Sequence, residues 1–417
     1  MARSGSMRGL IRSGGVIALA MAAMNVSTYA FTILAARLLG PAQYGAVASL
    51  MGLLLVVNVL ALGLQATGAR QVAADPGRRD QIEARIMAAT YRAALTLGAL
   101  CLVLAPLISW ALSLDGWHAA SMIGLSAIPL TLMGGQAGVL QGEQRWMPLA
   151  GIYLAAGLGR LVIGLVLMLL VPSAFGAMLA VAVAAWLPAV VGALALGHVG
   201  PRRRSTPRPR HQGGRILREV VTNSHALLAF FALSNLDVVL ARAVFAEHEA
   251  GLYAGGLILT KAVLFLPQFV VVIAFPSMAS TSAQHRMYLK GLVVVGTIGV
   301  VATAGAAALS DLALVFIGGA EYSQARPHLW LFALLGTLLA LIQLMVYEIV
   351  ARQRQSAIVV LWVGLLAVGT LGLVVDRGAG LAAGVAVIYT TVLVVLLGAA
   401  LLHPGSRARR VRDLPVG

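Results

Sequence analysis

The sequence has few charged residues, and acidic residues are the scarcest of them. Only 11% of its 417 residues are charged, against about 25% in an ordinary soluble domain. The 14 acids and 30 bases could not cover the surface of a soluble protein of this length, and 60% of the residues are hydrophobic. The composition therefore excludes a soluble enzyme, a disordered chain and a nucleic-acid-binding domain.

The chain also has a single cysteine, Cys101, which lies in an apolar run. One cysteine excludes an intrachain disulfide and a cysteine-rich structural metal site. A glycine-rich phosphate loop followed by lysine is absent as well, so the chain is not expected to hydrolyse ATP. We expect no cofactor, apart from a coupling Na⁺ or H⁺ ion.

Long apolar runs are what the sequence has in abundance. Twelve are long enough for a helix to cross a bilayer, which takes about 20 residues. They lie at 14–38, 43–67, 91–114, 119–140, 149–171, 174–198, 220–242, 251–275, 288–310, 327–349, 356–375 and 379–402. We therefore predict an all-α, multi-pass protein of the plasma membrane. The first run is too long for the apolar part of a signal peptide and is expected to be retained as a helix.

The basic residues predict the orientation, because lysine and arginine concentrate in cytoplasmic loops. With both termini inside, 24 of the 30 bases fall in inner segments and four in outer segments. The other two, Arg160 and Lys261, fall within spans. The net charge of +16 is therefore mostly a topology signal, and it also predicts contact with anionic lipids of the inner leaflet.

A basic, proline-rich segment divides the spans into two sets of six. The predicted parts are an N-terminal lobe (1–198), a cytoplasmic linker (199–219), a C-terminal lobe (220–403) and a basic cytoplasmic tail (404–417). The outer turn that begins at Arg37 resembles the one that begins at Arg242, since each has a short turn and then a glycine. Two lobes of equal orientation fit a pseudo-two-fold axis along the membrane normal. Arg37 and Arg242 become candidates for an outer gate.

Arg160 is the first candidate for a binding residue, because ionisable groups deep in a membrane are costly and default to functional hypotheses. It shares one helical face with Tyr153, Gly157 and Gly164. The small glycines are expected to leave room for a wide ligand, with Tyr153 beside it. The alternative is an arginine that pairs with a neighbouring helix.

Lys261 and Asp237 are the other charged candidates within spans. Lys261 shares a face with Gln268, and both are candidates for substrate binding. Asp237 is a candidate coupling site for a proton or sodium ion. Equally, it could stabilise its lobe by pairing with Lys261 or Arg242.

A polar stripe runs along the first span. Asn25, Thr28, Tyr29 and Thr32 are spaced as one helical face. Their hydroxyl and amide groups could bind sugar hydroxyls, or they could join helices through hydrogen bonds. Five further residues are weaker candidates of the same kind: Asn58, Gln65, Gln136, Gln141 and Asn223.

Three passages carry a resemblance to a known family. They are AARLLGPAQYG at 35–45, GVLQGEQRW at 138–146, and NLDVVLAR at 235–242 followed by EAGLYA at 249–254. The chain resembles the polysaccharide-biosynthesis flippases, of actinobacterial type, in the multidrug/oligosaccharidyl-lipid/polysaccharide exporter superfamily. The resemblance implies a two-lobed carrier with a central cavity that moves lipid-linked sugars from the inner to the outer leaflet.

The resemblance implies a polyprenyl-linked sugar as substrate, and glycosyltransferases or a polymerase of the same pathway as partners. We expect a monomer with no enzyme activity, in which Arg160 and Lys261 attract the phosphate or pyrophosphate. Three alternatives remain open: a drug or cation exporter of the same superfamily, a membrane-embedded polysaccharide polymerase or ligase, and a scaffold that transports nothing. A cationic drug would favour acids over bases in mid-membrane.

Overall fold

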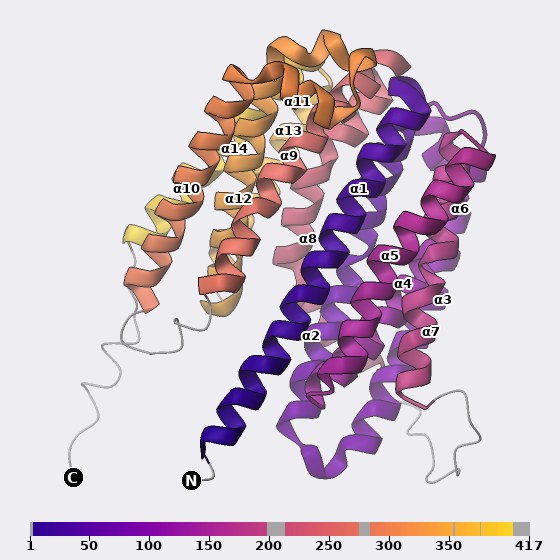
Figure 1. The fold of residues 1–417 in the computed structure, drawn as a ribbon, viewed down its shortest axis with the longest axis vertical. Helices are drawn as coiled ribbons and strands as arrows, with labels where there is room; N and C mark the ends of the chain where they lie inside the picture. The colour runs from indigo at the N-terminus through magenta and orange to yellow at the C-terminus, as the bar shows by residue number, and fades with distance from the viewer. Residues whose placement is uncertain (1–2, 198–212, 275–283, 353–354, 376, 403–417) are drawn as a thin grey trace.

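The computed structural model describes residues 3–197, 213–274, 284–352, 355–375 and 377–402. Side chains are described at 15–75, 77–197, 224–265, 290–346, 358–375 and 377–399. These residues form helices joined by short turns (Figure 1). The helices are α1 Arg3–Val57, α2 Val59–Ala74, η1 Pro76–Arg78, α3 Arg79–Ala111, α4 His118–Gly142, α5 Trp146–Leu170, α6 Ala174–Ala184, α7 Trp186–Ala195, α8 Gly213–Val244, α9 Glu247–Ala274, α10 Gln284–Ala308, α11 Ser310–Ile317, η3 Ala320–His328, α12 Leu329–Arg352, α13 Gln355–Gly372 and α14 Gly378–Leu402.

The twelve predicted spans are all accounted for by these helices. Nine segments of the described residues are long and apolar enough to cross a membrane, and the first of them, Gly15–Ala74, contains two predicted spans. The remaining two predicted spans correspond to α9 and to the shorter apolar helix α13. The prediction of an all-α membrane protein is confirmed.

The first two crossings are separated by a sharp bend in α1. At 55 residues α1 would extend about 80 Å if straight, far beyond the ~30 Å hydrocarbon core. Gly40, with φ at 69°, breaks the helix in the left-handed region that glycine tolerates, and Pro41 starts the returning segment. The chain therefore turns back at Gly40, which lies at the end of the molecule predicted to be outside.

Two predicted spans are interrupted. The second span is divided at Asn58, between α1 and α2, and the sixth at Ala185, between α6 and α7. The chain continues in nearly the same course, since the Ala185 amide still donates to the Val181 carbonyl at 3.0 Å. Helix α8 begins at Gly213, inside the range predicted as linker, whereas 198–212 and the tail from 403 lie outside the described residues.

Helices α1–α7 form one lobe and α8–α14 the other (Figure 1). Glycines bring the helices of the first lobe into close contact, since a Cβ atom on Gly138 of α4 would lie 2.8 Å from the Cα of Gln65 on α2. At the predicted inner end, the carboxylate of Glu143 pairs with Arg79 at 3.2 Å and with Arg145 at 3.3 Å. The passage 138–146 therefore fixes the turn between α4 and α5 to the start of α3.

Candidate functional site between the lobes

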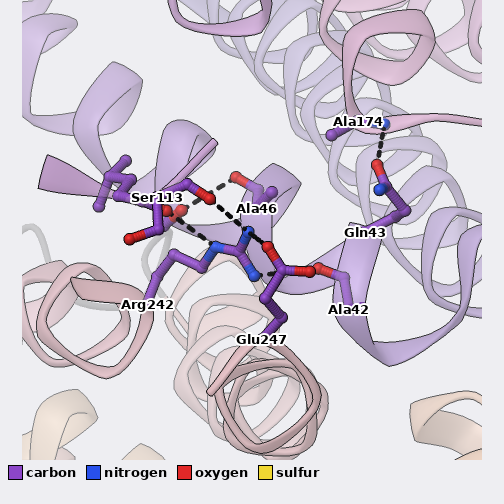
Figure 2. Close-up of polar contacts among 9 residues, drawn as sticks. Ala42, Gln43, Ala46, Ser113, Ala174, Arg242 and Glu247 are labelled. Atoms are coloured by element: carbon purple, nitrogen blue, oxygen red, sulfur yellow. Dashed lines mark hydrogen bonds and ion pairs between the residues drawn. The ribbon is translucent and has the colours of Figure 1, made fainter. Parts of the chain in front are cut away.

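Arg242, near the end of α8, joins the two lobes at their predicted outer end (Figure 2). Its side chain is buried, and its Nε donates to the carbonyl of Leu112 at 3.0 Å. Its terminal nitrogens donate to the carbonyls of Ser113 at 3.2 Å and Ala42 at 3.4 Å. The same guanidinium pairs with Glu247 of its own lobe at 2.7 Å. Arg242 thus satisfies three main-chain carbonyls of the opposite lobe.

Arg37 makes the matching contact in the other direction. Its Nη2 donates to the carbonyl of Val315 on α11 at 2.6 Å. The acceptor follows α10, the third span of its lobe, as Leu112 and Ser113 follow α3, the third span of theirs. The hydroxyl of Tyr322 in η3 adds a bond to the Ala36 carbonyl at 3.1 Å. Each of the two arginines therefore binds main-chain carbonyls beyond the third span of the other lobe.

Gly45 and Gly251, which end the two similar outer turns, lie against each other. A Cβ atom on Gly45 would lie 3.0 Å from the Cα of Gly251, and one on Gly251 would overlap the carbonyl of Pro41. The lobes are therefore packed backbone to backbone here, which is possible only because neither residue has a side chain.

A cleft of about 560 Å³ lies between α1 of one lobe and α9, α10 and α11 of the other. Its lining is mostly apolar, and Leu312 and Phe316, which are 54% and 49% exposed, contribute to it. Asn25 and Tyr29 provide its polar groups, and the Tyr29 hydroxyl also donates to the Ile258 carbonyl of α9 at 3.3 Å. Two of the four residues of the predicted polar stripe, Asn25 and Tyr29, therefore face the opposite lobe.

Thr28 and Thr32, the remainder of that stripe, are half-buried, and the Thr32 hydroxyl donates to the Thr28 carbonyl of its own helix at 3.0 Å. Gln268 lies on α9, but its side chain is outside the described ones.

Lys261 on α9 is held by α8. Its ammonium donates to the carbonyl of Ser234 at 2.8 Å and to Oδ1 of Asn235 at 3.0 Å. Asp237 is buried at 2% exposure, and its carboxylate accepts from the Tyr253 hydroxyl at 3.0 Å. Among the described residues Asp237 forms no ion pair with Lys261 or Arg242, so the predicted alternative of a direct pair is not what the structure has.

Arg160 lies mid-way along α5 on its inward side. The strongly exposed residues of α5, such as Val162 and Leu169, lie on the opposite side, which faces lipid. The Arg160 side chain is half-buried, and among the described residues it has no hydrogen bond or ion pair. The alternative of a pairing arginine therefore has no support in the described part of the chain.

The glycines beside Arg160 have a different role from the predicted one. A Cβ atom on Gly157 would contact the backbone of Met24, and one on Gly164 would contact the ring of Phe31. Both glycines let α1 pack closely on α5, so the expectation that they leave room for a ligand was wrong.

Tyr153, two turns from Arg160 on the same side of α5, belongs to a polar network inside the first lobe. The Gln65 amide of α2 donates to the Tyr153 hydroxyl at 2.9 Å and to Oε1 of Gln141 on α4 at 3.1 Å. Three helices thus bring amide and hydroxyl groups together near the inward face of α5.

Several parts of this site were not predicted from the sequence. The acceptors for Arg37 and Arg242 are main-chain carbonyls, which every residue has, so no residue type could have identified them. Helix α11 lies within a predicted loop, and only the apolar run at 312–317 hinted at it. Tyr322 had no signal of its own.

Comparisons with known proteins agree with this architecture. A family model described as "Polysaccharide biosynthesis protein" matches residues 33–327. An inward-facing multidrug-resistance MATE family transporter of the MOP superfamily has a TM-score of 0.73 and 12% identity, over 91% of this chain and 94% of that one. An outward-facing MATE family transporter has a TM-score of 0.61 and 14% identity, over 94% of each chain.

A third similar structure is a MOP superfamily transporter from Pyrococcus furiosus, with a TM-score of 0.55 and 14% identity over 94% of this chain and 96% of that one. Identities this low establish a shared fold alone. No curated protein sequence matches the chain.

Proposed function

Because the chain belongs to the polysaccharide biosynthesis protein family, we propose that it flips a lipid-linked oligosaccharide from the inner to the outer leaflet. The chain is a multi-pass membrane protein with the fold of the MOP superfamily transporters. Arg160 carries the proposal of an anionic, lipid-linked substrate. Its guanidinium lies inside the first lobe and has no hydrogen bond or ion pair among the described residues.

A guanidinium at this depth favours an anionic substrate. Burying an unpaired charge is costly, and a planar fork of donors binds phosphate oxygens in pairs. Lys261 adds a second cation from the other lobe, and two described acceptors leave one of its three N–H donors for a ligand. In the proposed mechanism these two residues attract the phosphate or pyrophosphate that links sugar to lipid.

The sugar and the lipid would then occupy different surroundings. The network of Gln65, Gln141 and Tyr153 offers amide and hydroxyl groups that suit sugar hydroxyls. The cleft between α1 and α9–α11 suits the polyprenyl chain, because it is apolar and several of its lining residues are exposed. A long isoprenoid could stay in this cleft while the polar headgroup crosses.

Transport then requires the two lobes to rock about their pseudo-two-fold axis. The contacts of Arg37 and Arg242 close the outer end, so both residues would act as gate residues that release their carbonyl acceptors when the cavity opens outward. Asp237 is proposed as the coupling residue, since a buried carboxylate that forms no direct ion pair among the described residues can bind a proton or a sodium ion.

The rival proposal is a drug or cation exporter, and the MATE transporters with this fold support it. The charges at mid-membrane favour the lipid-linked anion, since Arg160 and Lys261 are both basic. A precedent for altered charge is the Pyrococcus furiosus transporter, whose binding pocket is described as having reverse polarity and a suggested different function.

A flipping assay tests the proposal. The purified chain in liposomes should move a fluorescent polyprenyl-pyrophosphate sugar to the opposite leaflet, while a cationic dye should not be transported. Arg160→Gln should slow flipping about 30-fold or more, since charge-assisted hydrogen bonds contribute about 2–3 kcal/mol. Arg160→Lys should retain part of the rate. Flipping at the wild-type rate by Arg160→Gln would reject the phosphate role, and dye export without flipping would favour the rival.

A further inference from the structure

A second pocket lies at the predicted outer end of the first lobe, where α3 turns into α4. Its volume is about 540 Å³, within the range of about 300–1,000 Å³ that is usual for small-molecule sites. Two tryptophans and two serines line this outer pocket: Trp110, Trp117, Ser109 and Ser113. None of its lining residues is charged, and none of them also lines the cleft between α1 and α9–α11.

The two tryptophans give the outer pocket flat apolar walls. Trp110 is 79% exposed and Trp117 is 53% exposed. The ring of Trp117 stacks on His118 with 4.8 Å between the ring centroids, and His118 packs edge-on against Phe175 at 6.3 Å. Protein contacts therefore orient the Trp117 indole, and a ring that is already oriented loses little conformational freedom when a ligand binds.

The two serines add hydroxyl groups that the fold itself does not use. Ser109 is 7% exposed, and its hydroxyl makes no hydrogen bond among the described residues. Ser113 lies just after α3 with φ at 49°, where its amide donates to the Trp110 carbonyl at 3.2 Å. Helices that end in this way usually have glycine at this position, because an L side chain is strained there. Ser113 therefore keeps a hydroxyl at a strained position, and such strain points to a function.

Ser113 also connects the outer pocket to the contact between the lobes. Its carbonyl accepts from Nη2 of Arg242 at 3.2 Å, while the residue lines the pocket. A ligand in the pocket would therefore lie beside the outer gate. A variant of Ser113 must keep the backbone conformation that presents this carbonyl, and Ser113→Gly does so, because glycine adopts positive φ without strain.

We propose that the outer pocket binds one or two neutral sugar residues of a chain at the outer face. The apolar face of a sugar ring can pack on an indole, and its hydroxyls can bond to Ser109 and Ser113. A phosphate or a cation would not be stabilised here, because no charged side chain lines the pocket. The choice of a sugar rests on the proposed function, whereas the pocket and its free hydroxyls do not.

Binding of lipid-free sugars tests the proposal separately from flipping. The full chain in phosphatidylcholine nanodiscs is titrated with trisaccharides of glucose, mannose and galactose, and binding is measured by calorimetry. At least one sugar should bind saturably. Trp110→Ala and Trp117→Ala should each weaken its binding about tenfold, and Ser113→Gly about fivefold. Ser113→Gly relieves strain, so it tests the site even if a tryptophan variant fails to fold.

The matched control is Trp186→Ala, because Trp186 is 47% exposed and does not line the outer pocket. It should bind the sugar as the wild type does, and so should Arg160→Gln, whatever its rate of flipping. No saturable binding of any of the three sugars would overturn the proposal and leave the tryptophans as membrane-interface residues. Equal losses in Trp186→Ala and Trp110→Ala would overturn it too.

The source of the sugar is tested with the same trisaccharide linked to polyprenyl pyrophosphate. If Trp110→Ala weakens the binding of the linked and the lipid-free forms alike, the pocket accepts the sugar of a lipid-linked chain. If it weakens only the lipid-free form, the sugar comes from a free glycan.

Discussion

The guanidinium of Arg242 on α8 donates a hydrogen bond to the carbonyl of Ser113, at the end of α3 in the other lobe, over 3.2 Å. Arg37 makes the reverse connection to Val315. The same outer end also contains the direct contact of Gly45 with Gly251. A carrier built this way must break these contacts before it can open outward.

Removing the Arg242 side chain should favour opening at the outer end. Arg242→Ala should shift the equilibrium toward the open form about tenfold or more, because hydrogen bonds to a charged donor contribute about 1.5–3 kcal/mol each. Spin labels at Asp115 and His248, both exposed at this end, would report longer distances in a Cys101→Ala background.

The control for Arg242 is Arg326, which pairs with Asp311 at 2.9 Å within a single lobe. Arg326→Ala should leave the label distances unchanged. Unchanged distances in Arg242→Ala would show that the gate does not depend on this residue.

Adding a side chain at Gly251 should prevent close packing of the lobes. Gly251→Val places its Cβ against the Pro41 carbonyl and should lower the melting temperature, since overpacking typically costs about 1–3 kcal/mol. Gly296→Val is the control, because a Cβ atom there would meet no atom within 4 Å. A melting temperature for Gly251→Val equal to that of the control would contradict the contact.

Neutralising Asp237 should abolish the coupling of flipping to an ion gradient without removing the basic residues proposed to bind the substrate. Asp237→Asn keeps the size of the side chain and a carbonyl acceptor for the Tyr253 hydroxyl. If Asp237 binds the coupling ion, flipping by this variant should no longer respond to an imposed proton or sodium gradient. Liposomes with and without each gradient measure this, and a wild-type response to the gradient would assign coupling to another residue.

Filling the cleft between α1 and α9–α11 should slow the flipping of long-chain lipid substrates more than that of short-chain ones. Leu312→Trp adds bulk to the apolar lining, so flipping of a long-chain polyprenyl substrate should slow while that of a short-chain analogue persists. Leu366→Trp on α13 is the control, because Leu366 is 69% exposed and does not line the cleft. Equal slowing of both substrates would count against a lipid-chain role.

The sequence was sufficient to predict the spans and the fold class, because a membrane helix is recognised from some twenty consecutive apolar residues. It also predicted the similar turns at Arg37 and Arg242. The break at Asn58 and the helix α11 were not predicted, because Asn58 lies inside one continuous apolar run and α11 has only eight residues, too few to be read as a span.

The sequence by itself determined which residues are chemically unusual in a membrane: Arg160, Lys261 and Asp237. Only the tertiary structure decided what each of them contacts. It left Arg160 without a described partner, placed Lys261 on the carbonyl of Ser234 and put Asp237 beside Tyr253. The physical reason is that apolar runs are a local property, whereas the partners of a buried charge are set by how helices pack, and many of those partners are main-chain carbonyls common to every residue.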